Sequence, residues 1–231
     1  MQKSEFDRFA DEYYAEHAKG LRASGESPEF FYEYKVRAIA EALRARGRSS
    51  LRILDFGSGV GNSIPYFRKH IPAAALTCAD VSRRSLMVAE SRFPGAARSV
   101  EIEGDLLPFD NGQFDLVFSA CVFHHIPHSE HVHWLRELRR VASTSATLSI
   151  FEHNPWNPLT VKVVRECPFD ERAVLITGPD FKRAIATGGW STPEIHYKVF
   201  FPHALALLRP AEKWLRAVPL GAQYMALATA S

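Results

Sequence analysis

The chain has 231 residues, 46% of them hydrophobic and 23% charged, and its formal net charge is only +2 at pH 7. This length suits one α/β domain with an added cap and a sizeable core. The near-neutral charge argues against nucleic-acid binding, and no apolar run reaches the roughly 18 residues that span a membrane. Three cysteines without C-x-x-C spacing and no signal-like opening segment predict a reduced, cytoplasmic protein.

The first fifty residues predict two helices ahead of the sheet. Aromatic residues recur at helical spacing in the first helix. Pro28 suits the first turn of the second helix, which Gly47 ends. We therefore expect an N-terminal helical cap over residues 1–50 and an α/β domain over residues 51–231.

A glycine turn follows the first predicted strand. The strand runs from Leu51 to Phe56, and glycines stand at positions 57, 59 and 61. Glycine lets the backbone approach a ligand closely, and the helix that follows offers unpaired N–H groups with partial positive charge. The spacing departs from the G-x-G-x-x-G of nicotinamide dinucleotide sites, whose third glycine would stand at Asn62. Asp55 adds a carboxylate, which suits a ligand carrying ammonium and sulfonium charge better than a pyrophosphate.

Two further strands also end in acids. Asp80 closes the second strand about twenty residues after the glycine turn, where an acid can accept hydrogen bonds from ribose hydroxyls. Val81, the next residue, could lie against an adenine face. A third strand from Val100 leads to a loop containing Asp105, and residues 113–119 form the fourth strand. The ends of these strands should converge on one pocket, because parallel strands share a carboxyl edge.

The segments LDFGSGVG, GDLLPF and FDLVF together resemble the motifs of class I S-adenosylmethionine (SAM)-dependent methyltransferases over residues 51–126. The resemblance implies SAM as cofactor and S-adenosylhomocysteine as product. It also implies that Asp105 accepts from the adenine amino group and that the backbone of Leu106 meets the adjacent ring nitrogen. The opening FDRFADEYY is similar to small-molecule members, which makes Tyr13 a candidate lid residue. The predicted cofactor-binding residues are Asp55, Gly57, Ser58, Gly59, Gly61, Asp80, Val81, Asp105, Leu106, Ser119 and Tyr13.

The rest of the chain continues to alternate between helix and strand. Helices are predicted over 62–70, 82–93, 129–142, 179–187 and 203–216, and strands over 146–152, 194–201 and 222–228. Together with the resemblance, this alternation predicts an α/β fold: a Rossmann-like, seven-stranded, mostly parallel sheet with helices on both faces. An insert over residues 155–217 is rich in aromatic residues and leucine. It could line a pocket for an aromatic, lipid-like or polyketide-type acceptor, or simply pack on the sheet.

Polar residues at the ends of the fourth and fifth strands are candidates for the chemistry. His153 is the first candidate for a general base or acceptor-orienting group, and Glu152 the second. A positioned base is worth about 10²–10⁴-fold in rate. The alternative is that both only tie down the loop by hydrogen bonds. His125 matches a histidine that is commonly structural in the family, so its role is either structural or catalytic.

A metal site is considered for the histidine-rich segment and not predicted. His124, His128 and His131 have helical spacings that can chelate. Pro127 interrupts a continuous helix, however, and no nearby cysteines or carboxylates complete a ligand set. Methyl transfer needs no enzyme nucleophile, so Cys121 is expected to be a pocket-wall residue.

The leading hypothesis is a SAM-dependent methyltransferase that moves the sulfonium methyl group to an oxygen or nitrogen of a small-molecule acceptor, in a monomer or homodimer. One alternative is a nicotinamide-dependent oxidoreductase, which the glycine spacing disfavours. Another is a non-catalytic SAM-binding sensor or scaffold, which would bind SAM without transferring its methyl group.

Overall fold

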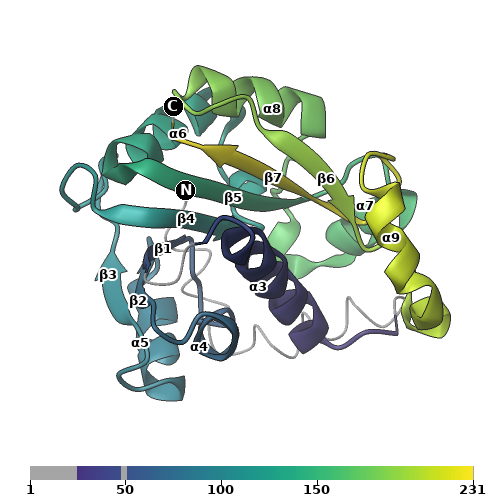
Figure 1. Ribbon diagram of the computed structural model, residues 1–231, viewed down its shortest axis with the longest axis horizontal. Coiled ribbons are helices and arrows are strands. Elements are labelled where there is room, and N and C mark those ends of the chain that lie inside the picture. Colours follow the sequence, from purple (N-terminus) through teal and green to yellow (C-terminus); the bar gives the residue numbers. More distant parts are fainter. Residues whose placement is uncertain (1–24, 48–50, 231) are drawn as a thin grey trace.

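The computed structural model describes residues 25–47 and 51–230, which build a seven-stranded sheet in the order β3-β2-β1-β4-β5-β7-β6 (Figure 1). The strands are β1 (Arg52–Phe56), β2 (Ala75–Asp80), β3 (Arg98–Glu101), β4 (Phe114–Ala120), β5 (Ala142–His153), β6 (Glu194–Lys198) and β7 (Gln223–Thr229). The α-helices are α3 (Pro28–Arg44), α4 (Ile64–His70), α5 (Arg83–Arg92), α6 (His131–Val141), α7 (Pro158–Glu166), α8 (Gly178–Thr187) and α9 (Glu212–Leu215). Short 3₁₀ turns are η2 (Phe123–His125), η3 (His128–Glu130), η4 (Pro168–Asp170) and η5 (His203–Ala211).

The sheet is mostly parallel, which confirms the predicted fold class. The first five strands pair in parallel, whereas β7 runs antiparallel to both β5 and β6. Strand order reverses between β1 and β4, because β2 and β3 lie on one side of β1 and the later strands on the other. Such a reversal opens a crevice at the carboxyl ends of the strands, where ligands bind in open α/β sheets.

Helices cover both faces of the sheet and make two hydrophobic cores (Figure 1). On one face, Ile53 of β1 packs in a core with Ile39 of α3 and with residues of α4 and α5. On the other face, Leu54 joins a core with Leu135 of α6 and Phe181 of α8. Successive strand residues point to opposite faces, so a strand covered on both sides is apolar throughout. An acid in such a strand, like Asp55, is therefore buried.

Two predictions about the end of the chain are wrong: residues 203–216 do not form one α-helix, and the strand predicted over 194–201 ends earlier. Residues 203–211 form a 3₁₀ segment that is non-helical at Leu205 and contains Pro210, and only the four residues of α9 are α-helical. Proline lacks the N–H that a helix interior requires. Strand β6 ends at Lys198 because Val199 adopts φ +60°, a left-handed conformation outside the β region.

Two other expectations concern the N-terminal segment and membrane-spanning helices. The first predicted helix, with Tyr13, lies outside the described residues, so its lid role stays a prediction. Within residues 25–47 and 51–230, no helix has both the length and the apolarity needed to cross a bilayer.

Candidate functional site

The glycine turn connects β1 to α4 at the carboxyl edge of the sheet. Gly57 and Gly59 have φ of +73° and +52°, which L side chains adopt only with strain. A Cβ added to Gly57 would lie 2.4 Å from Cγ2 of Val122, so a side chain here would collide with the loop after β4. The N–H of Gly57 donates to the carbonyl of Ala79 at 2.8 Å, which joins the turn to the end of β2. The turn is thus held in a shape that only glycine fits.

Two buried carboxylates flank this turn and line one cavity with it. Asp80 accepts from the N–H of Gly59 through one oxygen and from the N–H of Ser82 through the other, both at 2.8 Å. Asp55 accepts from the hydroxyl of Ser63. Burial raises the pKa of Asp55 to about 7, although the Ser63 hydrogen bond opposes the shift. A cationic group entering the cavity would therefore find a carboxyl group poised to ionise beside it.

The structure brings together six of the predicted cofactor residues around this cavity and places four others outside its lining. Those lining the cavity are Asp55, Gly57, Ser58, Gly59, Asp80 and Val81. Gly61 packs instead under α4, where a Cβ would lie 2.7 Å from Ile64. Ser119 is fully buried and donates to the carbonyl of Phe56 at 2.9 Å. Asp105 and Leu106 are exposed on a loop outside the cavity lining, so their adenine contacts stay predictions.

The cavity also has a polar wall, whose residues come from four separate segments of the chain. Cys121 follows β4 with φ +60°, and its Sγ lies 3.2 Å from Nζ of Lys35 on α3. Gln223 of β7 lies 3.7 Å from the same sulfur and 3.4 Å from Nδ1 of His153. Burial opposes ionisation of the Cys121 thiol, but Lys35 and His153 outweigh it and lower its pKa to about 6. Cys121 is therefore a pocket-wall residue, as expected, and its thiol ionises more readily than an ordinary cysteine thiol.

Glu152, the second sequence candidate for a base, supports the loop instead of facing the cavity. Its Oε1 accepts from the N–H groups of Val122 and Phe123 at 3.0 and 2.8 Å, and its Oε2 lies 2.6 Å from Nδ1 of His124. The side chain is only 1% exposed. Burial disfavours its charge, yet His124 and the backbone donors lower the pKa of Glu152 below its usual value. The geometry agrees with the loop-tying alternative for this residue.

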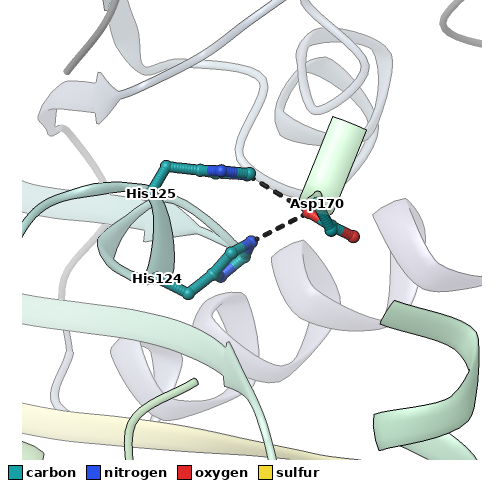
Figure 2. A group of neighbouring side chains, drawn as sticks. All are labelled: His124, His125 and Asp170. Carbon is teal, nitrogen blue, oxygen red and sulfur yellow. Dashed lines mark hydrogen bonds and ion pairs between the residues drawn. The ribbon is translucent and has the colours of Figure 1, made fainter. Parts of the chain in front are cut away.

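His153 and His125 both line the cavity, in different surroundings. His153 ends β5, and its ring lies 5.1 Å from that of His124. His125 lies in η2, where its Nε2 is 3.3 Å from Oδ1 of Asp170. Figure 2 shows His124 and His125 both directed at this carboxylate. Of the two candidates, His125 is thus already engaged with an acidic partner.

Sequence reasoning missed several residues of this wall. Lys35 and Gln223 read as ordinary helix and strand positions, and Asp170 lies in a C-P-F-D segment that carried no assigned role. The acid that ends this segment was the one available signal. His131, considered as a ligand at the sequence level, lies instead within 2.9 Å of the carbonyls of Phe123 and Ile126.

Comparisons with known proteins identify the fold and a methyltransferase domain. Residues 53–145 match the methyltransferase domain family. This part of the chain is a methyltransferase domain, and the fold is that of SAM-dependent methyltransferases. It is 29% identical over 123 residues to a ubiquinone/menaquinone biosynthesis C-methyltransferase of Ectopseudomonas mendocina, a match covering 50% of this chain and 47% of that relative. It is 27% identical to a trans-aconitate 2-methyltransferase of Methylobacterium nodulans, covering 82% and 76% of the two chains.

Solved structures share the fold of this methyltransferase. A Thermotoga maritima SAM-dependent methyltransferase, described as a possible histamine N-methyltransferase, has a TM-score of 0.70 at 16% identity and covers 99% of each chain. The magnesium protoporphyrin IX methyltransferase of Synechocystis, with bound S-adenosylhomocysteine, has a TM-score of 0.59 at 16% identity and covers 92% and 86%. Two of these neighbours, the Synechocystis enzyme and the methyltransferase CalH, were solved with S-adenosylhomocysteine bound. The chain spans only about half the length of the first curated relative.

Proposed function

We propose that this methyltransferase moves the SAM methyl group to an oxygen or nitrogen of a small-molecule acceptor, and that His153 receives the proton the acceptor loses. One observation carries the proposal. A single cavity is lined both by the glycine turn with its two carboxylates and by His153. SAM supplies a methyl carbon already activated by a sulfonium, so the protein has to align the acceptor and remove a proton.

The residues around the glycine turn fit SAM. The Gly59 backbone is free to approach a ligand because nothing lies within 4 Å of where its Cβ would be, and the site offers carboxylates rather than a phosphate cradle. We assign Asp80 to the ribose hydroxyls, Val81 to the adenine face and Asp55 to the ammonium end of the cofactor. Asp80 also supports the turn through its hydrogen bond to Gly59, so it would link cofactor binding to the shape of the loop.

The acceptor half of the cavity combines polar and apolar walls. Lys35, Cys121 and Gln223 accompany His153, while Val163 and Val164 of α7 add apolar surface from the insert. This mixture suits an acceptor with an apolar body and one hydroxyl, carboxyl or amino group. The trans-aconitate methyltransferase relative is named for a small organic acid acceptor, which supports a small molecule of this kind.

The raised pKa of Asp55 makes cofactor affinity depend on pH. Below pH 7 the Asp55 carboxyl is mostly protonated in the free protein, and the cofactor's ammonium group binds better to the carboxylate. We expect the dissociation constant of SAM to fall by up to about tenfold per unit as the pH rises from 5.5 towards 7, and then to level off. Isothermal titration calorimetry on the wild-type protein and Asp55→Asn measures this. A slope that persists in Asp55→Asn would exclude Asp55 as its source.

Replacing His153 tests the proposed transfer. In His153→Gln we expect the rate of labelled-methyl transfer to acceptors in a metabolite extract to fall about a hundredfold, with SAM affinity kept, because only the proton acceptor is lost. His128→Gln, which changes a histidine outside the cavity lining, should retain the wild-type rate.

Three outcomes would contradict the proposal. An unchanged rate in His153→Gln would remove this residue from the reaction. A product labelled on carbon would exclude transfer to oxygen or nitrogen and would match the name of the Ectopseudomonas relative. SAM binding without transfer to any acceptor in the extract would indicate the sensor alternative.

A further inference from the structure

Two imidazoles and a carboxylate converge in the lining of the cavity. The proposed methyl transfer uses none of these three residues. His124 and His125 come from η2 after β4, and Asp170 comes from η4 after α7, about 45 residues later in the chain. Their ligand atoms all lie within 4.8 Å of one another (Figure 2). The three residues also line the cavity. Two histidines with one carboxylate are a ligand set used by divalent transition metals.

The cluster is held in place by a second layer of contacts. Nδ1 of His124 lies 2.6 Å from Glu152, so the ring keeps its Nε2 directed at Asp170. A carboxylate behind a histidine in this way orients the ring and increases the basicity of its free nitrogen, as in many zinc sites. The N–H of Val174 donates to the carbonyl of His124 at 2.8 Å, which joins the segment after η4 to η2. The ligands are therefore positioned without an ion.

The spacing of the three groups fits a tetrahedral ion. Oδ1 of Asp170 lies 3.3 Å from Nε2 of His124 and 3.3 Å from Nε2 of His125. Ligands about 2.0–2.1 Å from a tetrahedral zinc ion are separated from each other by about 3.3 Å. Two of the three edges thus already have the required length, and the two imidazole ligand atoms lie within 4.8 Å of each other.

We propose that His124, His125 and Asp170 bind a divalent transition metal ion of the zinc class. Three protein ligands leave a coordination position open, as in catalytic rather than structural zinc sites. Because the cluster lines the cavity, water or an oxygen of the acceptor can reach that position. The part concerning the acceptor rests on the proposed function, whereas metal binding itself does not. The ion would orient an acceptor hydroxyl or carboxyl group and favour its deprotonated form.

The same groups could instead satisfy one another without a metal. A carboxylate oxygen can accept N–H bonds from both rings, and a protonated His124 can bridge Glu152 and Asp170. An ion must displace the proton on Nε2 of His124, while the proton on Nδ1 can stay with Glu152. An ion-pair network retains no metal, so direct binding measurements separate the two arrangements.

Titrating Co²⁺ into the untagged, chelator-treated full chain tests the proposal. We expect one ion per chain, an absorption spectrum typical of four- or five-coordinate Co²⁺, and displacement by Zn²⁺. Asp170→Asn and His125→Gln each remove one ligand and should weaken binding by at least about tenfold. Glu152→Gln should weaken it by about 10–100-fold through the loss of the supporting carboxylate. His128→Gln, which leaves all three ligands in place, should bind like the wild type.

Several results would overturn the metal site: no one-to-one binding, unchanged binding in both ligand variants, or an equal loss in His128→Gln. Circular dichroism checks that each variant is folded. If Asp170→Asn does not fold, the binding measured for His125→Gln decides whether the metal site exists. Binding is measured without SAM or acceptor. Failure of metal binding therefore does not contradict the proposed methyl transfer, and failure to detect methyl transfer does not contradict metal binding.

Discussion

Replacing Glu152 by alanine should lower the free energy of unfolding by about 3–5 kcal/mol, the range for removing one partner of a buried charge pair. The substitution leaves the N–H groups of Val122 and Phe123 without their acceptor, and it removes the carboxylate that lies 2.6 Å from His124. All of these groups are buried, so water does not readily replace the lost partner. Urea unfolding followed by circular dichroism measures the change.

Two control variants define what the result means. Glu152→Gln keeps a carbonyl acceptor and should lose less stability than alanine. Glu166→Ala removes an exposed glutamate 3.9 Å from Lys162 on α7 and should change the free energy of unfolding by less than about 0.5 kcal/mol. A loss of under about 1 kcal/mol in Glu152→Ala would show that this residue does not hold the loop after β4. The acceptor site would then need another support.

Gly57→Ala should lower the free energy of unfolding by about 2–4 kcal/mol and also weaken SAM binding. The added Cβ would lie 2.4 and 2.7 Å from the two methyl groups of Val122, so either the turn or the loop after β4 must shift. Overpacking of this kind costs about 1–3 kcal/mol, and the positive φ of +73° adds about 1 kcal/mol for a residue with a side chain. Thermal unfolding and SAM calorimetry measure the two effects.

Gly112→Ala separates crowding from backbone strain. Gly112 has a similar φ of +70°, but a Cβ added there meets nothing within 4 Å, so only the strain of about 1 kcal/mol should appear. Adding Val122→Ala to Gly57→Ala should recover part of the stability by making room for the new methyl group. Equal losses in Gly57→Ala and Gly112→Ala, with no recovery in the double variant, would contradict the crowding mechanism.

The sequence predicted that the glycine turn and the two acids beside it would meet at one edge of the sheet. Asp55, the glycine turn and Asp80 each stand at the end of a strand whose apolar run is visible locally. Parallel strands bring such ends to one edge, and in the structure they line one cavity. The irregular segment after β6 was predicted incorrectly, because a helical spacing of leucines says nothing of the break at Leu205 or of Val199 turning out of the strand.

The acceptor half depends on contacts between distant segments. Lys35, Asp170 and Gln223 come from α3, the insert and the last strand, and only packing brings them to the end of β4. Glu152 and His153 are neighbours in sequence, and the sequence alone does not distinguish the surroundings of their two polar side chains. Alternation along β5 gives them different surroundings: Glu152 is buried under the loop after β4, while His153 lines the cavity.

The sequence by itself therefore determined the resemblance to SAM-dependent methyltransferases, most of the order of strands and helices, and the glycine turn, because these depend on residue spacing within one strand-turn-helix unit. The tertiary structure alone decided which polar side chains meet across the cavity and which carboxylate is occupied by backbone donors. Those contacts join residues 28 to 189 positions apart, such as Glu152 with His124 or Tyr34 with Gln223, and no local pattern records them.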